Sequence, residues 1–256
     1  MIIKLKIKIA NEKLNIENLK AYFADKSILK TDDIFRFYRN QEPGISISNV
    51  NWRIYNLKKQ GIINRIGTGK YHLSTEKIYQ PEISTKIKTL NQRLKRQFPF
   101  LKICIWSTSA INEFMHHQPG KYYTLIEVEK KSAEAVFYYL KEKAGEVYLE
   151  PNEDTIRKYI FTSKNPIIVK TLVTESPLQN AEGVDTITIE KMLVDIYCDK
   201  IIFESQQGSE LANIFRDAID KYTVNENRML RYANRRSGKS EINNFLNIVS
   251  GYRTHG

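Results

Sequence analysis

Residues 46–73 read SISNVNWRIYNLKKQGIINRIGTGKYHL, and this stretch decides the fold of the amino-terminal third. Its first half places apolar side chains at i, i+4 and i+7, a spacing that predicts one buried face of a helix. The residues of this face are Val50, Ile54 and Leu57. Ser46 and Ser48 are both suitable N-caps, and Gly61 suits the left-handed position that follows a helix.

The second half of the stretch predicts a β-hairpin, because two short β-prone runs flank the turn Gly67-Thr68-Gly69. Two helices are predicted upstream, one from Asn15 and one capped by Thr31. The apolar faces expected for them are Ile16, Leu19, Tyr22 and Phe23, and then Ile34, Phe35 and Tyr38. Three helices followed by a hairpin is the element order of a winged helix-turn-helix, so we expect that fold here.

The positive charge of the chain is concentrated towards its amino-terminal end. The sequence of 256 residues has a net charge of +11. Residues 1–97 hold 20 lysines and arginines against 8 acidic residues, whereas residues 98–225 hold 14 against 19 and residues 226–256 hold 6 against 2. Cations gathered at one end favour a polyanionic partner there, because phosphate contacts dominate the affinity of proteins for nucleic acids.

A helix that enters the major groove of DNA needs an apolar face to hold it on its domain and a polar face to reach base edges. The predicted helix has both, since asparagine can pair with adenine and arginine with guanine. Trp52 could pack on a sugar or a thymine methyl, or lie half-buried between helices. Lysines and arginines at the helix end and in the hairpin are expected to contact phosphates. The predicted DNA-binding residues are Ser46, Ser48, Asn49, Asn51, Trp52, Arg53, Lys58, Lys59, Arg65, Thr68 and Lys70.

Strand-like and helix-like segments mix after Phe98-Pro99, so the expected fold class is α+β. We expect a winged-helix domain with an extended amino-terminal arm, a connecting helix, a mixed α/β domain and a helical carboxyl-terminal region. Their predicted bounds are 1–75, 76–97, 98–205 and 206–256. The expected strands of the second domain are 101–106, 122–128, 146–149 and 166–173, and the expected later helices are 109–116, 132–143, 189–199, 210–222 and 225–248.

Several groups of residues are similar to those of a known family. In the first third they are Pro43-Gly44-Ile45-Ser46, Asn51-Trp52-Arg53-Ile54-Tyr55, Leu57, Lys59, Gly61 and the run from Arg65 to Tyr71. Further on they are Ile105-Trp106-Ser107-Thr108, Asn112-Glu113-Phe114 and the run from Glu190 to Asp195. These segments resemble the amino-terminal winged helix and the second domain of AbiEi-type antitoxins.

This resemblance implies a bacterial antitoxin of a type IV toxin–antitoxin system that represses its own operon through the winged helix. Its nucleic-acid partner would be the double-stranded DNA of its own promoter. Its functional partner would be a nucleotidyltransferase-like toxin, which some systems of this type counteract without a stable protein–protein complex. The resemblance implies no enzymatic activity, and neither it nor the motifs call for a cofactor or a metal.

Two other functions stay open at this point. Glu129 and Lys131 have the E-x-K spacing of metal-dependent nucleases, and Glu113 is the nearest upstream carboxylate that could complete such a site. The chain would then be a nuclease that docks on DNA through the winged helix. Winged helices also serve as protein-interaction modules, so an adaptor without DNA contact is the other alternative.

The remaining motifs predict little further chemistry. Adjacent His116 and His117 would point about 100° apart on a helix, which makes a shared metal unfavourable. Gly238-Lys239-Ser240 lacks the upstream glycine of a phosphate-binding loop. Cys104 and Cys198 are expected to be buried thiols in a reducing cytoplasm. We expect neither a signal peptide nor a membrane span, because the alternation of isoleucine and lysine near the amino terminus suits neither.

Overall fold

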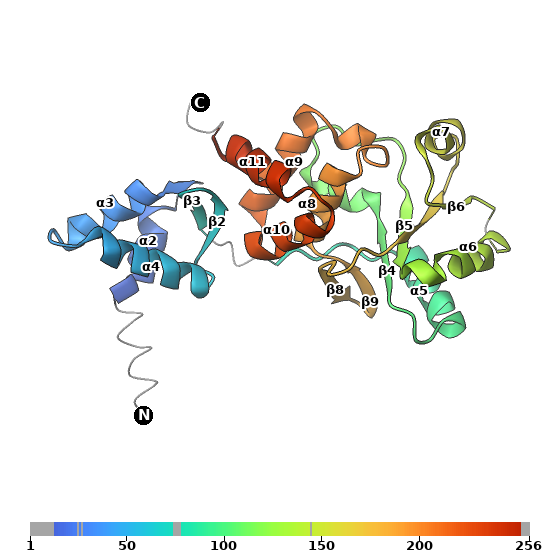
Figure 1. Cartoon of the computed structure of the whole chain (residues 1–256), viewed down its shortest axis with the longest axis horizontal. Helices are drawn as coiled ribbons and strands as arrows, with labels where there is room; N and C mark the ends of the chain where they lie inside the picture. Colours follow the sequence, from blue (N-terminus) through green and yellow to red (C-terminus); the bar gives the residue numbers. More distant parts are fainter. Residues whose placement is uncertain (1–12, 25, 27, 74–77, 144, 252–256) are drawn as a thin grey trace. The chain divides into compact units, whose positions relative to one another are not determined.

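The computed structural model is a mixed α+β protein, in agreement with the fold class expected from the sequence (Figure 1). It describes residues 13–24, 26, 28–73, 78–143 and 145–251, so the predicted arm at residues 1–10 lies outside the described residues. Contacts within the chain define two units, and each is described by itself. Unit 1 is Met1–Ile78, Ile219–Glu226 and Asn243–Gly256, and unit 2 is Tyr79–Ala218 and Asn227–Ile242.

Unit 1 combines helices with a small antiparallel sheet. Its elements are α2 (Ile16–Tyr22), β1 (Leu29–Lys30), α3 (Thr31–Gln41), α4 (Ile47–Lys59), β2 (Ile63–Gly67) and β3 (Lys70–Leu73). The predicted hairpin is formed by β2 and β3, and its turn includes Gly69 with a φ of 65°. The sequence did not predict β1, which pairs with β3 and gives the strand order β1-β3-β2.

The predicted apolar stripe of α4 is buried. Val50 is 1% exposed, Ile54 5% and Leu57 0%. Two predictions for the earlier helices were wrong in detail. The exposed fraction of Tyr22 is 60%, and the aromatic ring buried beside Tyr38 is that of Phe37 rather than Phe35.

The structure shows which residue caps α4 and corrects the predicted N-cap of α3. The hydroxyl of Ser46 accepts a hydrogen bond from the Asn49 amide at 3.2 Å, so α4 begins immediately after Ser46 and not at Ser48. Thr31, predicted as the N-cap of α3, is instead its first residue. Lys30 takes the capping position because its amide donates to Oδ2 of Asp33 at 2.8 Å.

The Ser46 cap leads to a stability prediction. Ser46→Ala should lower the free energy of unfolding by about 1 kcal/mol, because it leaves a first-turn amide of α4 without its side-chain acceptor. Ser48→Ala is the matched control, since the Ser48 side chain is exposed and caps nothing. Urea denaturation of both variants measures the difference, and equal stabilities would show that the cap contributes nothing.

Unit 2 is built on a mixed sheet. Its strands are β4 (Ile103–Ser107), β5 (Thr124–Val128), β6 (Val147–Leu149) and β7 (Ile167–Thr171), in the spatial order β4-β5-β7-β6. The edge strand β4 runs antiparallel to β5, with Ile105 opposite Ile126. The other pairs are parallel, and Ile126 lies opposite Val169 of β7. Three of these strands fall inside runs that the sequence predicts as strands, and β4 extends one residue beyond its predicted run, to Ser107.

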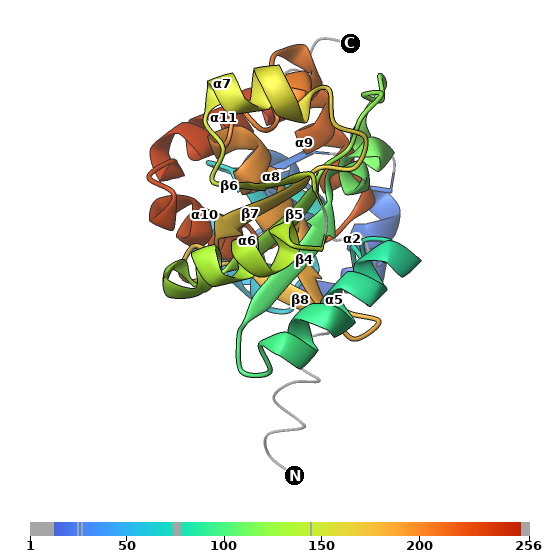
Figure 2. The same cartoon turned by 90° about the vertical axis from the view of Figure 1, so that its right-hand side faces the viewer.

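Helices cover both faces of this sheet, and the alternation of side chains along the strands decides which residues meet them. One face, with Ile105, Ile126 and Val169, packs against α5 (Thr85–Gln97) and α6 (Ala133–Lys141). The opposite face, which includes Glu127, meets α8 (Ile189–Cys198). Figure 2 shows α6 in front of the strands and α8 behind them. The helix predicted as a connection between domains, α5, thus belongs to the core of unit 2.

Smaller elements complete unit 2. A hairpin that the sequence did not predict consists of β8 (Leu178–Ala181) and β9 (Val184–Ile187). The segment predicted as a helix after β4 is the 3-10 helix η1 (Thr108–Phe114). The remaining short segments are η2 (Lys130–Ser132), α7 (Glu153–Thr155), the π-helical η3 (Ile156–Ile160) and η4 (Glu204–Gln206).

The carboxyl-terminal region is helical, as predicted, but its last helix is divided. The elements are α9 (Ser209–Lys221), α10 (Glu226–Arg235) and α11 (Lys239–Gly251). The sequence predicts one helix over 225–248, whereas the chain turns at Ser237, whose φ is 56°. The Gly238 amide then donates to the Ala233 carbonyl at 2.9 Å, a bond typical of a helix end. Gly238-Lys239-Ser240 is therefore the junction between two helices.

Candidate functional site

The face of α4 opposite its buried stripe presents polar and aromatic side chains. Ser48, Asn49 and Asn51 are exposed. Trp52 is 45% exposed, so it is not sealed between helices, and Tyr55 is 62% exposed. Tyr55 was not among the predicted DNA-binding residues, although it follows Asn51 by four positions and Trp52 by three, which places all three on one helix face.

Arg53 occupies a different place from the one expected for a residue that reads bases. Its side chain is only 11% exposed, and its Nη2 donates to Oε2 of Glu42 at 2.5 Å. Its guanidinium carbon lies 4.5 Å from the centre of the Tyr38 ring. Arg53 therefore connects α4 with α3 and with the turn between them. These contacts correct the expectation that the guanidinium of Arg53 points outwards to pair with guanine.

Two of the predicted DNA-binding residues in the hairpin, Thr68 and Lys70, also form hydrogen bonds within unit 1. The Thr68 amide donates to Oδ1 of Asn247 at 3.1 Å, and Nζ of Lys70 donates to the Asn247 carbonyl at 3.4 Å. Lys58 is partly buried, and Arg65 is exposed. The side chain of Lys59 lies outside the described part of the structure. The predicted residues that α4 brings together on its surface are thus Ser48, Asn49, Asn51 and Trp52.

The buried carboxyl group of Glu226 lies near the positive charges of Arg65 and Lys58. Glu226 is 9% exposed, and its Oε2 has no hydrogen-bond partner among the described residues. Burial raises the pKa of Glu226 to about 7, against the opposing effect of the positive charges of Arg65 and Lys58. The folded chain therefore favours the protonated form of this side chain over a range of pH in which the unfolded chain ionises it.

This raised pKa gives a pH-dependent prediction for Glu226→Gln. The contribution of Glu226 to stability is present below its ordinary pKa of 4.5 and is lost as the pH rises through about 7. The variant, which cannot ionise, should resemble the natural chain at pH 5 and be the more stable of the two at pH 8. Urea denaturation at both pH values measures this, and a stability difference that does not change with pH would refute it.

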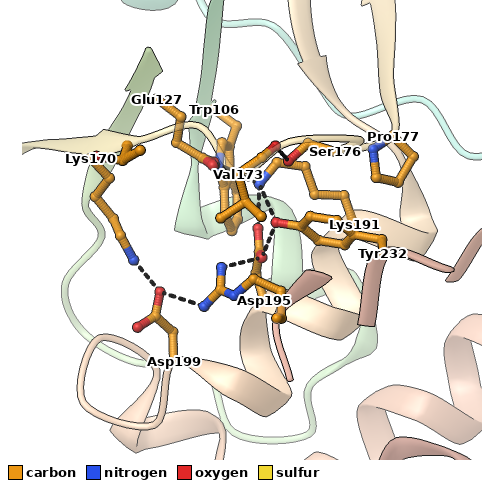
Figure 3. A network of polar contacts seen from close by, with 12 residues as sticks. Trp106, Glu127, Lys170, Val173, Ser176, Pro177, Lys191, Asp195, Asp199 and Tyr232 are labelled. Atoms are coloured by element: carbon orange, nitrogen blue, oxygen red, sulfur yellow. Dashed lines mark hydrogen bonds and ion pairs between the residues drawn. The ribbon is translucent and has the colours of Figure 1, made fainter. Parts of the chain in front are cut away.

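A network of buried charges lies in unit 2, between the sheet and α8 (Figure 3). Lys191 of α8 is 0% exposed, and its Nζ donates to both carboxylate oxygens of Glu127 at 2.8 and 2.7 Å and to Asp195. The indole nitrogen of Trp106 donates to Glu127 at 3.0 Å. Burial alone would lower the pKa of Lys191, but the carboxylates of Asp195 and Glu127 raise it well above its usual value, so the ammonium is charged.

The network continues along α8 as alternating charges. Asp195 accepts hydrogen bonds from the Tyr232 hydroxyl at 2.8 Å and from Nη1 of Arg236 at 2.9 Å. Arg236 also pairs with Asp199 at 3.3 Å, and Asp199 pairs with Lys170 of β7. Each of the network's carboxylates thus has at least one cation beside it, as buried charges require. The network joins β5, β7, α8 and α10, and Lys191 at its centre is sealed from solvent, so we assign it to architecture rather than to chemistry on a substrate.

A cavity with polar residues in its lining also lies in unit 2. Ser107, Asn112 and Glu113 line a cavity of about 510 Å³ between η1 and the segment that leads into α5. Nδ2 of Asn112 donates to the Tyr122 hydroxyl at 2.7 Å, whereas its Oδ1 is buried without a hydrogen-bond partner among the described residues. The Ser109 hydroxyl donates to that of Ser107 at 2.7 Å. These residues form a polar pocket.

The residues proposed for a nuclease are not brought together around a metal. Glu129 and Lys131 lie just past the end of β5 with exposed side chains. Throughout the described residues, no group of three histidine, cysteine, aspartate or glutamate side chains has the geometry to hold a metal ion. Both cysteines are thiols; Cys104 is buried as expected, whereas Cys198 is only partly buried. Burial raises the pKa of Cys198 to about 11 and that of Cys104 well above its usual value.

Comparison with known proteins assigns a family but not an activity. The profile of a family of unknown function, DUF6577, matches residues 49–251. The chain belongs to this family. The DUF6577 region covers most of α4, the β2–β3 hairpin and the elements of unit 2. No curated protein matches the sequence. Within the described residues, no helix has both the length and the apolar character that crossing a membrane requires.

Proposed function

We propose that α2, α3, α4 and the β2–β3 hairpin form a winged helix-turn-helix that binds double-stranded DNA. The observation that carries this proposal is the two-sided character of α4. Its buried stripe fixes the helix on unit 1, and its opposite face presents Asn49, Asn51, Trp52 and Tyr55. Residues 1–78, which belong to unit 1, hold 15 lysines and arginines against 7 acidic residues, and this excess supplies a favourable field for a polyanion.

The side chains on this face suit the major groove. The amide of Asn51 can form a bidentate pair with adenine, and the exposed rings of Trp52 and Tyr55 can pack against thymine methyl groups. Arg53 has a positioning role in this proposal, since its contacts with Glu42 and Tyr38 hold the middle of α4 against α3 and the residue that follows it. The proposal therefore expects operators that contain A·T pairs at the positions under α4.

We further propose that the chain is an antitoxin and represses its own operon. The support is the resemblance of its sequence segments to AbiEi-type antitoxins, together with the surface of α4. Expression of the chain should rescue cells from a nucleotidyltransferase-like toxin encoded beside it, as measured by colony counts after toxin induction. A neighbouring gene of that kind whose toxicity is unaffected by this chain would refute the antitoxin assignment.

The DNA-binding proposal is tested with the full chain and a labelled duplex from upstream of its gene. Binding should exceed that of an unrelated duplex and should weaken with salt, with a slope of log K against log [salt] of about −4 or steeper if several phosphates are contacted.

The adaptor alternative has its own support in the exposed apolar side chain of Ile47, which is 67% exposed beside this face. Binding that is absent or insensitive to salt would favour the adaptor.

A further inference from the structure

A groove in unit 2 has a chemical character that the proposed DNA-binding face does not explain. It lies between α5 and α6, which cover the same face of the sheet (Figure 2), and has a volume of about 340 Å³. Its floor is apolar and includes Leu90, Leu140 and Ile167, each no more than 9% exposed. This volume lies within the range of small-molecule sites in proteins.

The rim of this groove is positively charged. Lys86, Arg93 and Lys143 line it, together with the hydroxyls of Thr85 and Thr89, and no carboxylate is among the described lining residues. Nζ of Lys143 lies 5.1 Å from the centre of the Tyr139 ring, which also lines the groove. Three cations and two hydroxyls around an apolar floor with one aromatic ring suit a ligand that combines an anion with a planar ring.

The partners of the cations on α5 support the idea that the groove binds an anion. Lys88 pairs with Glu182 at 2.5 Å, and Nζ of Lys95 donates to the Gly183 carbonyl at 3.2 Å, so both side chains extend to the β8–β9 hairpin. Lys86, in contrast, has one hydrogen-bond partner among the described residues, the neutral side-chain amide of Asn165, whose Oδ1 accepts from its Nζ at 3.3 Å. Arg93 has no hydrogen bond or ion pair with any of the described residues. The cations at the groove therefore keep a charge that the described residues do not neutralise.

We propose that this groove binds a nucleotide, with its phosphates at Lys86, Arg93 and Lys143 and its base against Tyr139 and the apolar floor. Charged hydrogen bonds from lysine and arginine are the strong contacts that phosphates make in proteins. Stacking on an aromatic ring accepts any base, because every base has a π-face. The nucleotide is either a free one or part of a single strand, and the two sources share this chemistry.

Isothermal titration calorimetry of the full chain with ADP tests the proposal, with adenosine and inorganic phosphate titrated separately. Arg93→Gln/Lys143→Gln should weaken ADP binding at least tenfold. The matched control is Lys88→Gln/Lys95→Gln, which removes the same charge from side chains that extend away from the groove, and it should stay within twofold of the natural chain. Thermal melting confirms that both variants are folded.

A ten-nucleotide single-stranded RNA distinguishes the two sources, in a background that carries Asn51→Ala and Trp52→Ala so that α4 does not contribute. RNA binding that the groove variant also weakens assigns the site to a strand, whereas binding of ADP alone assigns it to a free nucleotide. The proposal is overturned if ADP does not bind at millimolar concentration, if adenosine binds as tightly as ADP, or if the two variants lose affinity equally. None of these results bears on duplex DNA binding by α4.

Discussion

Lys191→Met should lower the free energy of unfolding by about 3–5 kcal/mol. The substitution keeps the length of the side chain but leaves the carboxylates of Glu127 and Asp195 buried without their shared cation. Burying a charge without a partner is among the most destabilising changes available to a protein core. Urea denaturation followed by circular dichroism measures the effect.

The exposed Lys130 provides the control, because Lys130→Met should change stability by less than about 0.5 kcal/mol. Addition of Glu127→Gln and Asp195→Asn to Lys191→Met should restore part of the lost stability, since neutral amides cost less to bury than carboxylates. A loss below about 1 kcal/mol for Lys191→Met would show that the network is not the structural centre of unit 2.

The second large effect concerns the surface of α4. The triple variant Asn51→Ala/Trp52→Ala/Tyr55→Ala should weaken specific duplex binding by about 100-fold or more, because each side chain that meets a base edge contributes roughly 1–3 kcal/mol of discrimination. Binding to an unrelated duplex should change much less, since that affinity comes from phosphates. Fluorescence anisotropy with both duplexes separates the contribution of base contacts from that of phosphate contacts.

Asn40→Ala is the matched control for this series, as it removes an exposed amide from the neighbouring helix α3. It should leave both affinities within about twofold of the natural chain, because it lies outside the proposed contact face. Equal losses in specific binding for the control and the triple variant would contradict the assignment of α4.

Most regular elements could be predicted from the sequence because their signals are local. The i, i+4, i+7 spacing of Val50, Ile54 and Leu57 is enough to define a buried helix face. The elements that were missed depend on tertiary context or on weak turn signals. The strand β1 is two residues long and exists through its pairing with β3, and the β8–β9 turn uses Glu182-Gly183, with φ values of 51° and 80°, rather than a stronger turn pair.

The candidate site was predicted only in part, for a related reason. Asn51 and Trp52 are exposed because helix geometry alone places them opposite the buried stripe. Arg53 is different, because its direction depends on Glu42 and Tyr38, which the sequence alone does not bring together. Lys191 and Asp195 sit at i and i+4 on α8, a spacing common on solvated helices, and nothing local reveals that Glu127 meets them inside the protein.

The central claim, that α4 lies in the major groove of duplex DNA, is tested most directly by site-specific cross-linking. A photoreactive group attached to the cysteine of Ser48→Cys in the full chain should cross-link to bases of the upstream duplex. The same group on Ala135→Cys, an exposed position on α6, should not. Equal cross-linking from both positions, or none from position 48 in a chain that binds the duplex, would contradict the account.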